Sequence, residues 1–142
     1  MIHQVSVFLE NRPGQLSEIT KIISDAGVDL RALNIAETAD YGILRLIVNS
    51  TQKMLDALKD HGYVASVADV IAVAVPDHPG GLAELLQIIS DKGLDIEYMY
   101  SIFSQKEGLA YLIFRVKQLE ECLKLFEEHG VRQAAAEELG IH

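Results

Sequence analysis

The feature that most constrains the fold is an internal repeat. The stretch ENRPGQLSEITKIISDAGVDL, residues 10–30, returns in altered form as DHPGGLAELLQIISDKGLDI, residues 77–96. Pro13 corresponds to Pro79 and Gly14 to Gly80, and each copy continues with a Ser-Asp pair, a Gly and an Asp. A repeat at about half the chain length predicts two related units, each too small to bury a large core alone. We therefore expect two domains, residues 1–69 and 70–142.

The first copy predicts a complete order of elements. Residues 4–9 alternate like a half-buried strand, and a helix follows from Pro13, with apolar residues at helical spacing up to Gly27. Residues 28–37 and 42–49 are two β-rich runs of a hairpin, residues 51–60 a second helix, and residues 63–70 a closing strand. This β-α-β-β-α-β order is the ferredoxin-like plan, in which two helices cover one face of an antiparallel sheet.

The second copy repeats the plan. Strands are predicted at residues 70–76, 94–103, 109–116 and 131–137, and helices follow residues 80 and 118. No linker rich in Pro, Ser or Gly separates the copies. The predicted fold class is therefore α+β, with two tandem ferredoxin-like βαββαβ units whose antiparallel sheets carry helices on one face.

Charge and composition exclude several classes of function. The formal net charge is −9 and the basic residues are scattered, so a nucleic-acid partner is not expected. No apolar run is long enough to span a bilayer, and the N-terminus lacks the basic start of a signal peptide. The single cysteine, Cys122, has no partner for a disulfide, which fits a reducing compartment. We expect a cytoplasmic protein with no membrane partner.

The repeated turn from strand to helix suits an anion. Backbone N–H groups at a helix N-terminus point outward with the positive end of the helix dipole behind them. Gly14 and Gly80 allow close approach, and Asn11 and Asp77 place short polar groups at the rim. A zwitterionic amino acid would use both the N–H groups and the acidic residues nearby. The alternative interpretation needs no ligand, because Pro presets the first helical turn and Gly permits the bend.

The residues LENRPGQLSEITKIISDAGVDLRAL, 9–33, resemble an ACT domain, the amino-acid-binding regulatory module attached to phosphoglycerate dehydrogenases and aspartokinases. The whole chain resembles two tandem copies. The resemblance implies a ligand between two paired domains, held by Asn11 of the loop and by Asp29 at the start of the next strand, with Asp77 and Asp95 as counterparts. Asp29 replaces an Asn often found there, and Asp77 with His78 departs from the Asn-Arg pair. The candidate ligand-binding residues are Asn11, Arg12, Pro13, Gly14, Leu16, Asp29, Leu30, Asp77, His78, Gly80 and Asp95.

Other residues favour structural roles. Asp29 and Asp95 follow helix ends and can instead bond turn amides, as Asp often does. Tyr98, Tyr100 and Tyr111 can line a pocket, although an interface role is the favoured interpretation.

Metal and catalytic sites find little support. The five histidines have no metal-binding spacing, and His61 and His129 fall at helix ends, where an imidazole can face the negative end of the dipole. No nucleophile elbow, zinc motif or phosphate loop is present. We expect no enzyme activity, no cofactor and no metal site.

The leading hypothesis is a non-catalytic sensor of amino-acid metabolism that binds an amino acid between ACT-like units. Ile43 and Ile47 lie on the strand face opposite Leu44 and Leu46, so more surface is buried than one unit can hide, and we expect a homodimer. The alternative is a ligand-free interaction module that docks on a metabolic enzyme. An enzyme activity of its own ranks below both.

Overall fold

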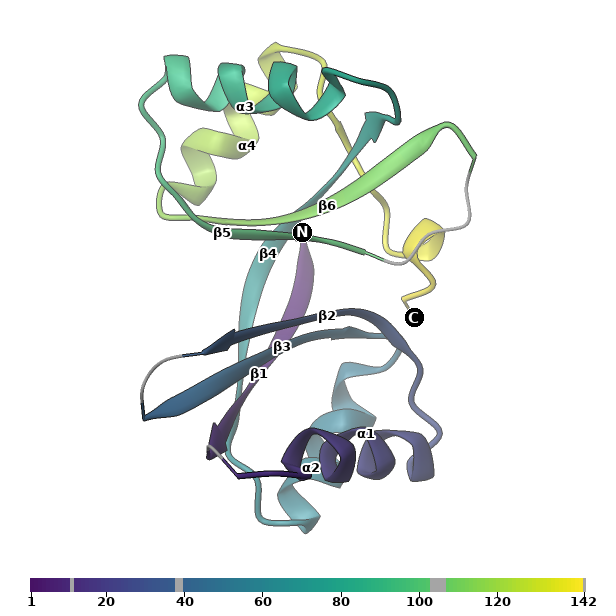
Figure 1. Cartoon of the computed structure of the whole chain (residues 1–142). Coiled ribbons are helices and arrows are strands. Elements are labelled where there is room, and N and C mark those ends of the chain that lie inside the picture. The colour runs from purple at the N-terminus through teal and green to yellow at the C-terminus, as the bar shows by residue number, and fades with distance from the viewer. Residues whose placement is uncertain (11, 38–39, 103–106, 142) are drawn as a thin grey trace. The chain divides into compact units, whose positions relative to one another are not determined.

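The chain divides into two compact units. The computed structural model describes residues 1–10, 12–37, 40–102 and 107–141. The N-terminal unit comprises residues 3–68 together with 140–142, and the C-terminal unit comprises residues 1–2 and 69–139. Figure 1 shows the helices and strands of each unit. The domain bounds 1–69 and 70–142 stay a prediction.

The N-terminal unit has the predicted βαββαβ order. Its elements are β1 (Ile2–Glu10), α1 (Gln15–Asp25), β2 (Leu30–Glu37), β3 (Tyr41–Val48), α2 (Thr51–Asp60) and the first residues of β4 (Ala65–Pro76). β3 pairs antiparallel with both β1 and β2, and β4 lies beside β1, so the order across the sheet is β2-β3-β1-β4. Both helices cover the same face of this sheet (Figure 1).

The core of the N-terminal unit lies between that face and the two helices. Apolar side chains recur on one side of α1 and of α2, and they meet the alternate residues of the strands that point inward. Burial of this stripe, rather than intrinsic propensity, holds helices of this length in place. The core residues are Val5, Val7, Ile19, Ile23, Val28, Leu44, Leu46, Val48, Met54 and Leu58.

The C-terminal unit repeats the plan from the second part of β4. It continues with α3 (Gly81–Asp91), β5 (Ile96–Ser101), β6 (Leu109–Val116), α4 (Leu119–Glu128), β7 (Arg132–Gln133) and a short 3-10 helix, η1 (Glu137–Leu139). β4 pairs with β6 and β7, and β6 pairs with β5, all antiparallel. The order across this sheet is therefore β5-β6-β4-β7, as in the first unit. Its core includes Val73, Ile89, Phe114, Cys122 and Phe126.

The last predicted strand is much shorter than expected. Residues 131–137 were expected to be extended, but the strand consists of Arg132 and Gln133, followed by one hydrogen bond from the Ala134 amide to the Ala72 carbonyl of β4 (2.9 Å), and the chain then turns into η1. The Glu138 carboxylate explains the turn, because it accepts hydrogen bonds from Arg132 (2.9 and 2.8 Å), from the Tyr111 hydroxyl (2.8 Å) and from the Ala135 amide (2.9 Å). These donors lower the pKa of Glu138 to about 2, with the Arg132 hydrogen bond as the largest cause.

Candidate functional site

The repeated turn has the same backbone in both units. The Arg12 amide donates to the Glu10 carbonyl at 2.8 Å, and the His78 amide donates to the Pro76 carbonyl at 3.0 Å. Gly14 (φ 83°) and Gly80 (φ 90°) then adopt the left-handed conformation at the N-cap positions of α1 and α3. Among the described residues no side chain caps either helix, so the first turn keeps backbone donors that an anion can use. Asn11 lies outside the described residues.

Three of the predicted residues meet in one pocket of the N-terminal unit. Arg12, Pro13 and Leu16 line a space of about 450 Å³ between the turn and the far end of β2, which we call the loop pocket. Arg12 is half exposed and lies 3.8 Å from Glu10 and 3.4 Å from Glu18. The loop pocket is lined by Leu9, Glu10, Arg12, Pro13, Gln15, Leu16, Ile35, Glu37 and Gly42.

Asp29 and Leu30 lie at the opposite end of α1 from this pocket. The eleven residues of α1 separate Asp29 from Gly14, a helix length of about 16 Å. The Asp29 carboxylate pairs with Arg31 at 3.1 Å, and its backbone exchanges hydrogen bonds with Asn49. Within one unit the structure therefore does not bring Asp29 and the turn together. Leu30 is half-buried against the core.

The predicted residues of the second copy are also separated. The Asp77 amide donates to the Gly108 carbonyl at 3.0 Å, and His78 Nδ1 lies 2.9 Å from the Pro79 carbonyl oxygen. Asp95 lies beyond the other end of α3, where its amide donates to Gln118 Oε1 at 3.2 Å. Asp95 lines a pocket there with Ser90 and other residues of α3, remote from Gly80 along the helix.

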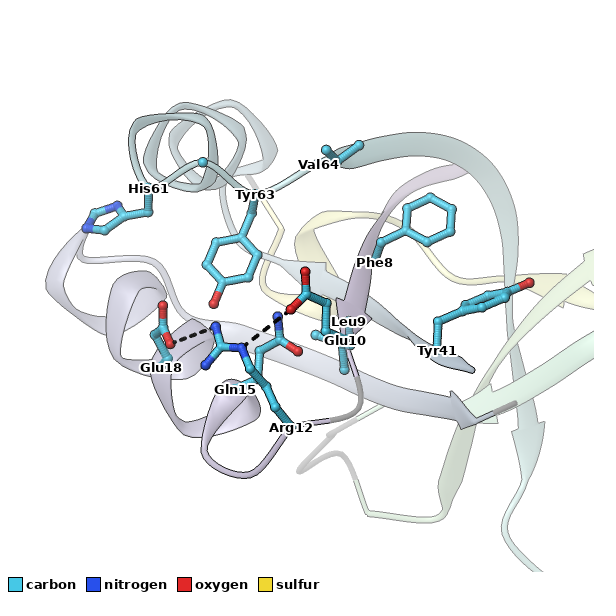
Figure 2. A pocket seen from close by; sticks show the side chains of 11 residues that line it. Phe8, Leu9, Glu10, Arg12, Gln15, Glu18, Tyr41, His61, Tyr63 and Val64 are labelled. Carbon is cyan, nitrogen blue, oxygen red and sulfur yellow. Dashed lines mark hydrogen bonds and ion pairs between the residues drawn. The ribbon is translucent and has the colours of Figure 1, made fainter. Parts of the chain in front are cut away.

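A second pocket beside the same turn was missed by sequence reasoning. It has a volume of about 400 Å³ and lies between the turn and the connection from α2 to β4; we call it the Gln15 pocket (Figure 2). Gln15 is only 6% exposed, and its Oε1 atom and the Tyr63 hydroxyl are buried with no hydrogen-bond partner in the described part of the chain. Burial raises the pKa of Tyr63, and Glu18 nearby raises it further. The pocket is lined by Phe8, Leu9, Glu10, Arg12, Gln15, Glu18, Tyr41, His61, Gly62, Tyr63 and Val64.

The sequence contains one sign of this pocket, which is a difference between the two copies. In the C-terminal unit Gly81 stands where the first copy has Gln15, and Val131 stands where it has Tyr63. The corresponding pocket, of about 380 Å³, includes His129, Gly130 and Val131, and it lacks both polar side chains. Polar residues present in one copy and absent from the other are a sign of specialisation that the sequence alone displays.

The remaining candidates have structural partners. His61 Nδ1 lies 2.8 Å from the Ala57 carbonyl and His129 Nδ1 lies 3.0 Å from that of Leu125, at the ends of α2 and α4 as predicted. Burial raises the pKa of the Cys122 thiol to about 11, so it stays protonated at neutral pH. The Tyr111 hydroxyl donates a hydrogen bond to the Glu138 carboxylate.

Two further features are absent from the part of the chain that the structure describes. Within those residues no three or more His, Cys, Asp or Glu side chains gather in a way that could hold a metal ion. Within the same residues no helix has the length and apolarity to cross a membrane.

Comparisons with known proteins agree with this architecture. Residues 1–139 match the family model of the ACT domain pair. The crystal structure of a protein from Bacteroides thetaiotaomicron superposes with a TM-score of 0.89 at 39% identity, covering 98% of this chain and 95% of that chain.

More distant structures share the fold alone. The regulatory subunit of aspartate kinase from Thermus thermophilus has a TM-score of 0.65 at 16% identity, covering 89% of this chain and 91% of that chain. The corresponding subunit from Thermus flavus has a TM-score of 0.60 at 15% identity, covering 89% and 90%. A search of curated proteins found no match. The family match over nearly the whole chain decides the assignment: the protein belongs to the ACT domain pair family.

Proposed function

We propose that this protein is a non-catalytic regulator that binds an amino acid at a site completed between two ACT units. The proposal rests on one observation, which is that the two groups of predicted ligand-binding residues lie apart within one unit. Arg12, Pro13 and Leu16 line the loop pocket, whereas Asp29 lies about 16 Å away at the other end of α1. A second unit that presents its own Asp29 to the loop pocket would complete the site.

The chemistry of the loop pocket suits a zwitterion. The uncapped first turn of α1 and the Arg12 guanidinium offer donors to a carboxylate. Glu37, which lines the same pocket, and an Asp29 from another unit would offer acceptors to the ammonium group. Leu9, Leu16 and Ile35 give an apolar wall for a side chain.

The partner unit is proposed to come from a second copy of the chain. β2 is an outer strand of the N-terminal sheet and β5 an outer strand of the C-terminal sheet, and an outer strand can pair with another chain. A homodimer would then carry ligand occupancy from one unit to another and onward to an enzyme of amino-acid metabolism. The lone, buried Cys122 fits action in the reducing cytoplasm.

The alternative function is a ligand-free module that docks on a partner enzyme. It is favoured by two observations: Asp29 is already engaged by Arg31, and Phe8 and Val64 leave apolar surface exposed at 54% and 69%. Such a module would gain no stability from any amino acid.

A thermal-shift panel against the twenty amino acids separates these two functions. A ligand that binds only the folded protein adds about 2.7 kcal/mol of stability at a hundredfold excess over its Kd. We expect one or a few amino acids to raise the melting temperature, and calorimetry then gives the stoichiometry per chain. A flat panel would favour the docking module.

A pair of variants tests the assignment to the loop pocket. Arg12→Met removes the cation from the pocket and is expected to weaken amino-acid binding at least tenfold. Lys21→Met is the matched control, because Lys21 is an exposed cation of α1 that pairs with Asp25 at 3.0 Å and lines neither pocket of this unit. Equal loss of binding in both variants would point to general electrostatics and away from the loop pocket.

A further inference from the structure

Two buried polar atoms in the Gln15 pocket have no hydrogen-bond partner among the residues that the structure describes. Gln15 is the first residue of α1 and is 6% exposed, yet its Oε1 atom makes no hydrogen bond. The hydroxyl of Tyr63, which follows α2, is buried and equally unpaired. Buried polar groups are satisfied in the great majority of cases, so each exception calls for an explanation. A bound ligand that donates hydrogen bonds would explain both unpaired atoms at once.

The polar groups converge on one space from three elements. Figure 2 shows the Gln15 amide, the Tyr63 hydroxyl, the Arg12 guanidinium and the Glu18 carboxylate turned toward one another. Gln15 and Glu18 belong to the first turn of α1, Arg12 to the turn after β1, and Tyr63 to the connection that precedes β4. The site therefore exists only when the turn and this connection are folded against each other.

The free hydrogen-bonding capacity in this space includes two acceptor oxygens, those of Gln15 and Tyr63, besides the O–H donor of Tyr63. The amide oxygen of Gln15 can only accept. Arg12 is already paired with Glu10 and Glu18, so these three side chains together carry one negative charge. Tyr63 remains a neutral phenol, because burial raises its pKa above an already high value, and a phenol can accept a hydrogen bond. A positively charged N–H donor matches this arrangement.

Aromatic rings border the same pocket. The centroids of Phe8 and Tyr41 lie 6.1 Å apart, and these side chains are 54% and 44% exposed. Rings in such a position can pack against an alkyl chain and attract a cation through their faces. A ligand with an ammonium head and a short apolar tail would use both the polar and the aromatic residues.

We propose that the Gln15 pocket binds the primary ammonium group of an alkylamine. Gln15 Oε1 and Tyr63 Oη accept its N–H groups, Glu18 balances its charge, and Phe8 with Tyr41 holds its carbon chain. This site is distinct from the proposed amino-acid site, which faces β2 and depends on a second unit, although the two pockets share Leu9, Glu10, Arg12 and Gln15. It is complete within the N-terminal unit.

The C-terminal unit provides an internal control. Gly81 and Val131 replace Gln15 and Tyr63 there, while Glu84 keeps the place of Glu18, its amide donating to the Gly80 carbonyl just as that of Glu18 donates to Gly14. The negative charge is thus preserved in the second unit without the two acceptors. Binding that needs the acceptors must be confined to the first unit.

Titration of the isotopically labelled full chain with n-butylammonium, followed by amide NMR shifts, tests the proposal. We expect saturable shifts for Gln15 and for residues 61–64, with a Kd of about 1 mM, within reach of a ligand with so few atoms. Tetramethylammonium, which has charge but no N–H group, should bind at least tenfold more weakly, because it keeps only the attraction to the aromatic faces, and butyrate, which has the opposite charge, should leave these resonances unchanged. Equal shifts with tetramethylammonium, binding of butyrate instead, or no saturable shift with n-butylammonium would each overturn the proposal.

Variants assign the binding to named groups. Gln15→Leu and Tyr63→Phe are each expected to raise the Kd about tenfold, because each removes one acceptor from a charged donor. Glu18→Gln should weaken binding several-fold, and Glu84→Gln, the matched change in the second unit, should have no effect. A dispersed spectrum shows that each variant is folded. Unchanged affinity in both Gln15→Leu and Tyr63→Phe, or an equal loss in Glu84→Gln, would contradict the site.

The result is independent of the amino-acid panel. An amino acid that stabilises the protein while n-butylammonium shifts nothing would overturn the alkylamine site and leave the loop pocket standing. Saturable n-butylammonium binding with a flat amino-acid panel would support the alkylamine site and overturn the proposed amino-acid site in the loop pocket.

Discussion

The two units share a backbone plan and differ in the side chains beside the repeated turn. In the N-terminal unit Gln15 and Tyr63 bring two unpaired polar atoms into a pocket, whereas Gly81 and Val131 leave the corresponding pocket without them. The C-terminal unit places its polar network elsewhere, around Glu138. Duplication has kept the scaffold, because the core and the turns depend on it, while the polar residues have diverged.

The largest expected difference between the units concerns Gly81 and Gln15. A Cβ atom at Gly81 would collide with the backbone carbonyl oxygen of Pro76, which cannot rotate away as a side chain can. Gly81→Ala should therefore lower the free energy of unfolding by about 3 kcal/mol. Gln15→Ala at the matching position should change it by less than about 1 kcal/mol, since it removes an unpaired acceptor along with some packing.

Urea denaturation of the two variants measures this contrast. Similar losses in both would mean that the close approach at Gly81 relaxes easily. That result would leave the replacement of Gln15 by Gly81 without a steric reason.

The Glu138 network is expected to make the C-terminal unit sensitive to acid. Its carboxyl has a folded pKa of about 2, below its usual value of 4.5, so the stability it contributes is complete above about pH 4.5 and is lost as pH falls toward 2. Glu138→Gln should lower the free energy of unfolding by about 2 kcal/mol at neutral pH, a value kept modest because Arg132 is half exposed.

The pH dependence identifies the cause. The difference between wild type and Glu138→Gln should shrink between about pH 4.5 and pH 2 when stability is measured by denaturation at each pH. A difference that stays constant with pH would show that packing, and not the charge of Glu138, stabilises η1.

The smallest effects on stability expected from changes at the repeated turn itself are equal in the two units. Gly14 and Gly80 both have positive φ, and a Cβ at either position would meet no atom within 4 Å. Gly14→Ala and Gly80→Ala should each cost about 1 kcal/mol, because the left-handed conformation is unfavourable for a residue with a Cβ. Thermal denaturation of both variants checks this, and clearly unequal losses would show that the shared backbone is under different strain in each unit.

Much of the fold was predictable because its signals are local. The helix over residues 51–60, the hairpins and the βαββαβ order follow from apolar periodicity and from turn residues a few positions apart. The final strand was predicted too long for the opposite reason. The end of this strand is decided by Glu138. Its partner Tyr111 is 27 residues away, and its partner Arg132 is six residues away, a spacing that matches no local pattern.

The candidate site was predictable only in part. The sequence pointed to Arg12, Pro13 and Leu16, which line the loop pocket, but it also placed Asp29 in the same site, whereas Asp29 lies at the other end of α1. Nothing in the sequence indicated that Gln15 and Tyr63 share one pocket, because those residues belong to different elements. They become neighbours only when the connection after α2 packs against the turn after β1.

The sequence by itself determined the duplication, the order of the elements and the two turns, since each depends on periodicity or on residues adjacent in the chain. The tertiary structure alone decided which polar groups are buried without partners and which are satisfied. Gln15 and Glu138 are both polar residues near a helix start, and nothing local distinguishes them. Packing left the Gln15 oxygen without a partner among the described residues, whereas the Glu138 carboxylate received donors from nearby Arg132 and Ala135 and from the distant Tyr111. Burial and partner geometry depend on how the segments fold together, which residue type does not reveal.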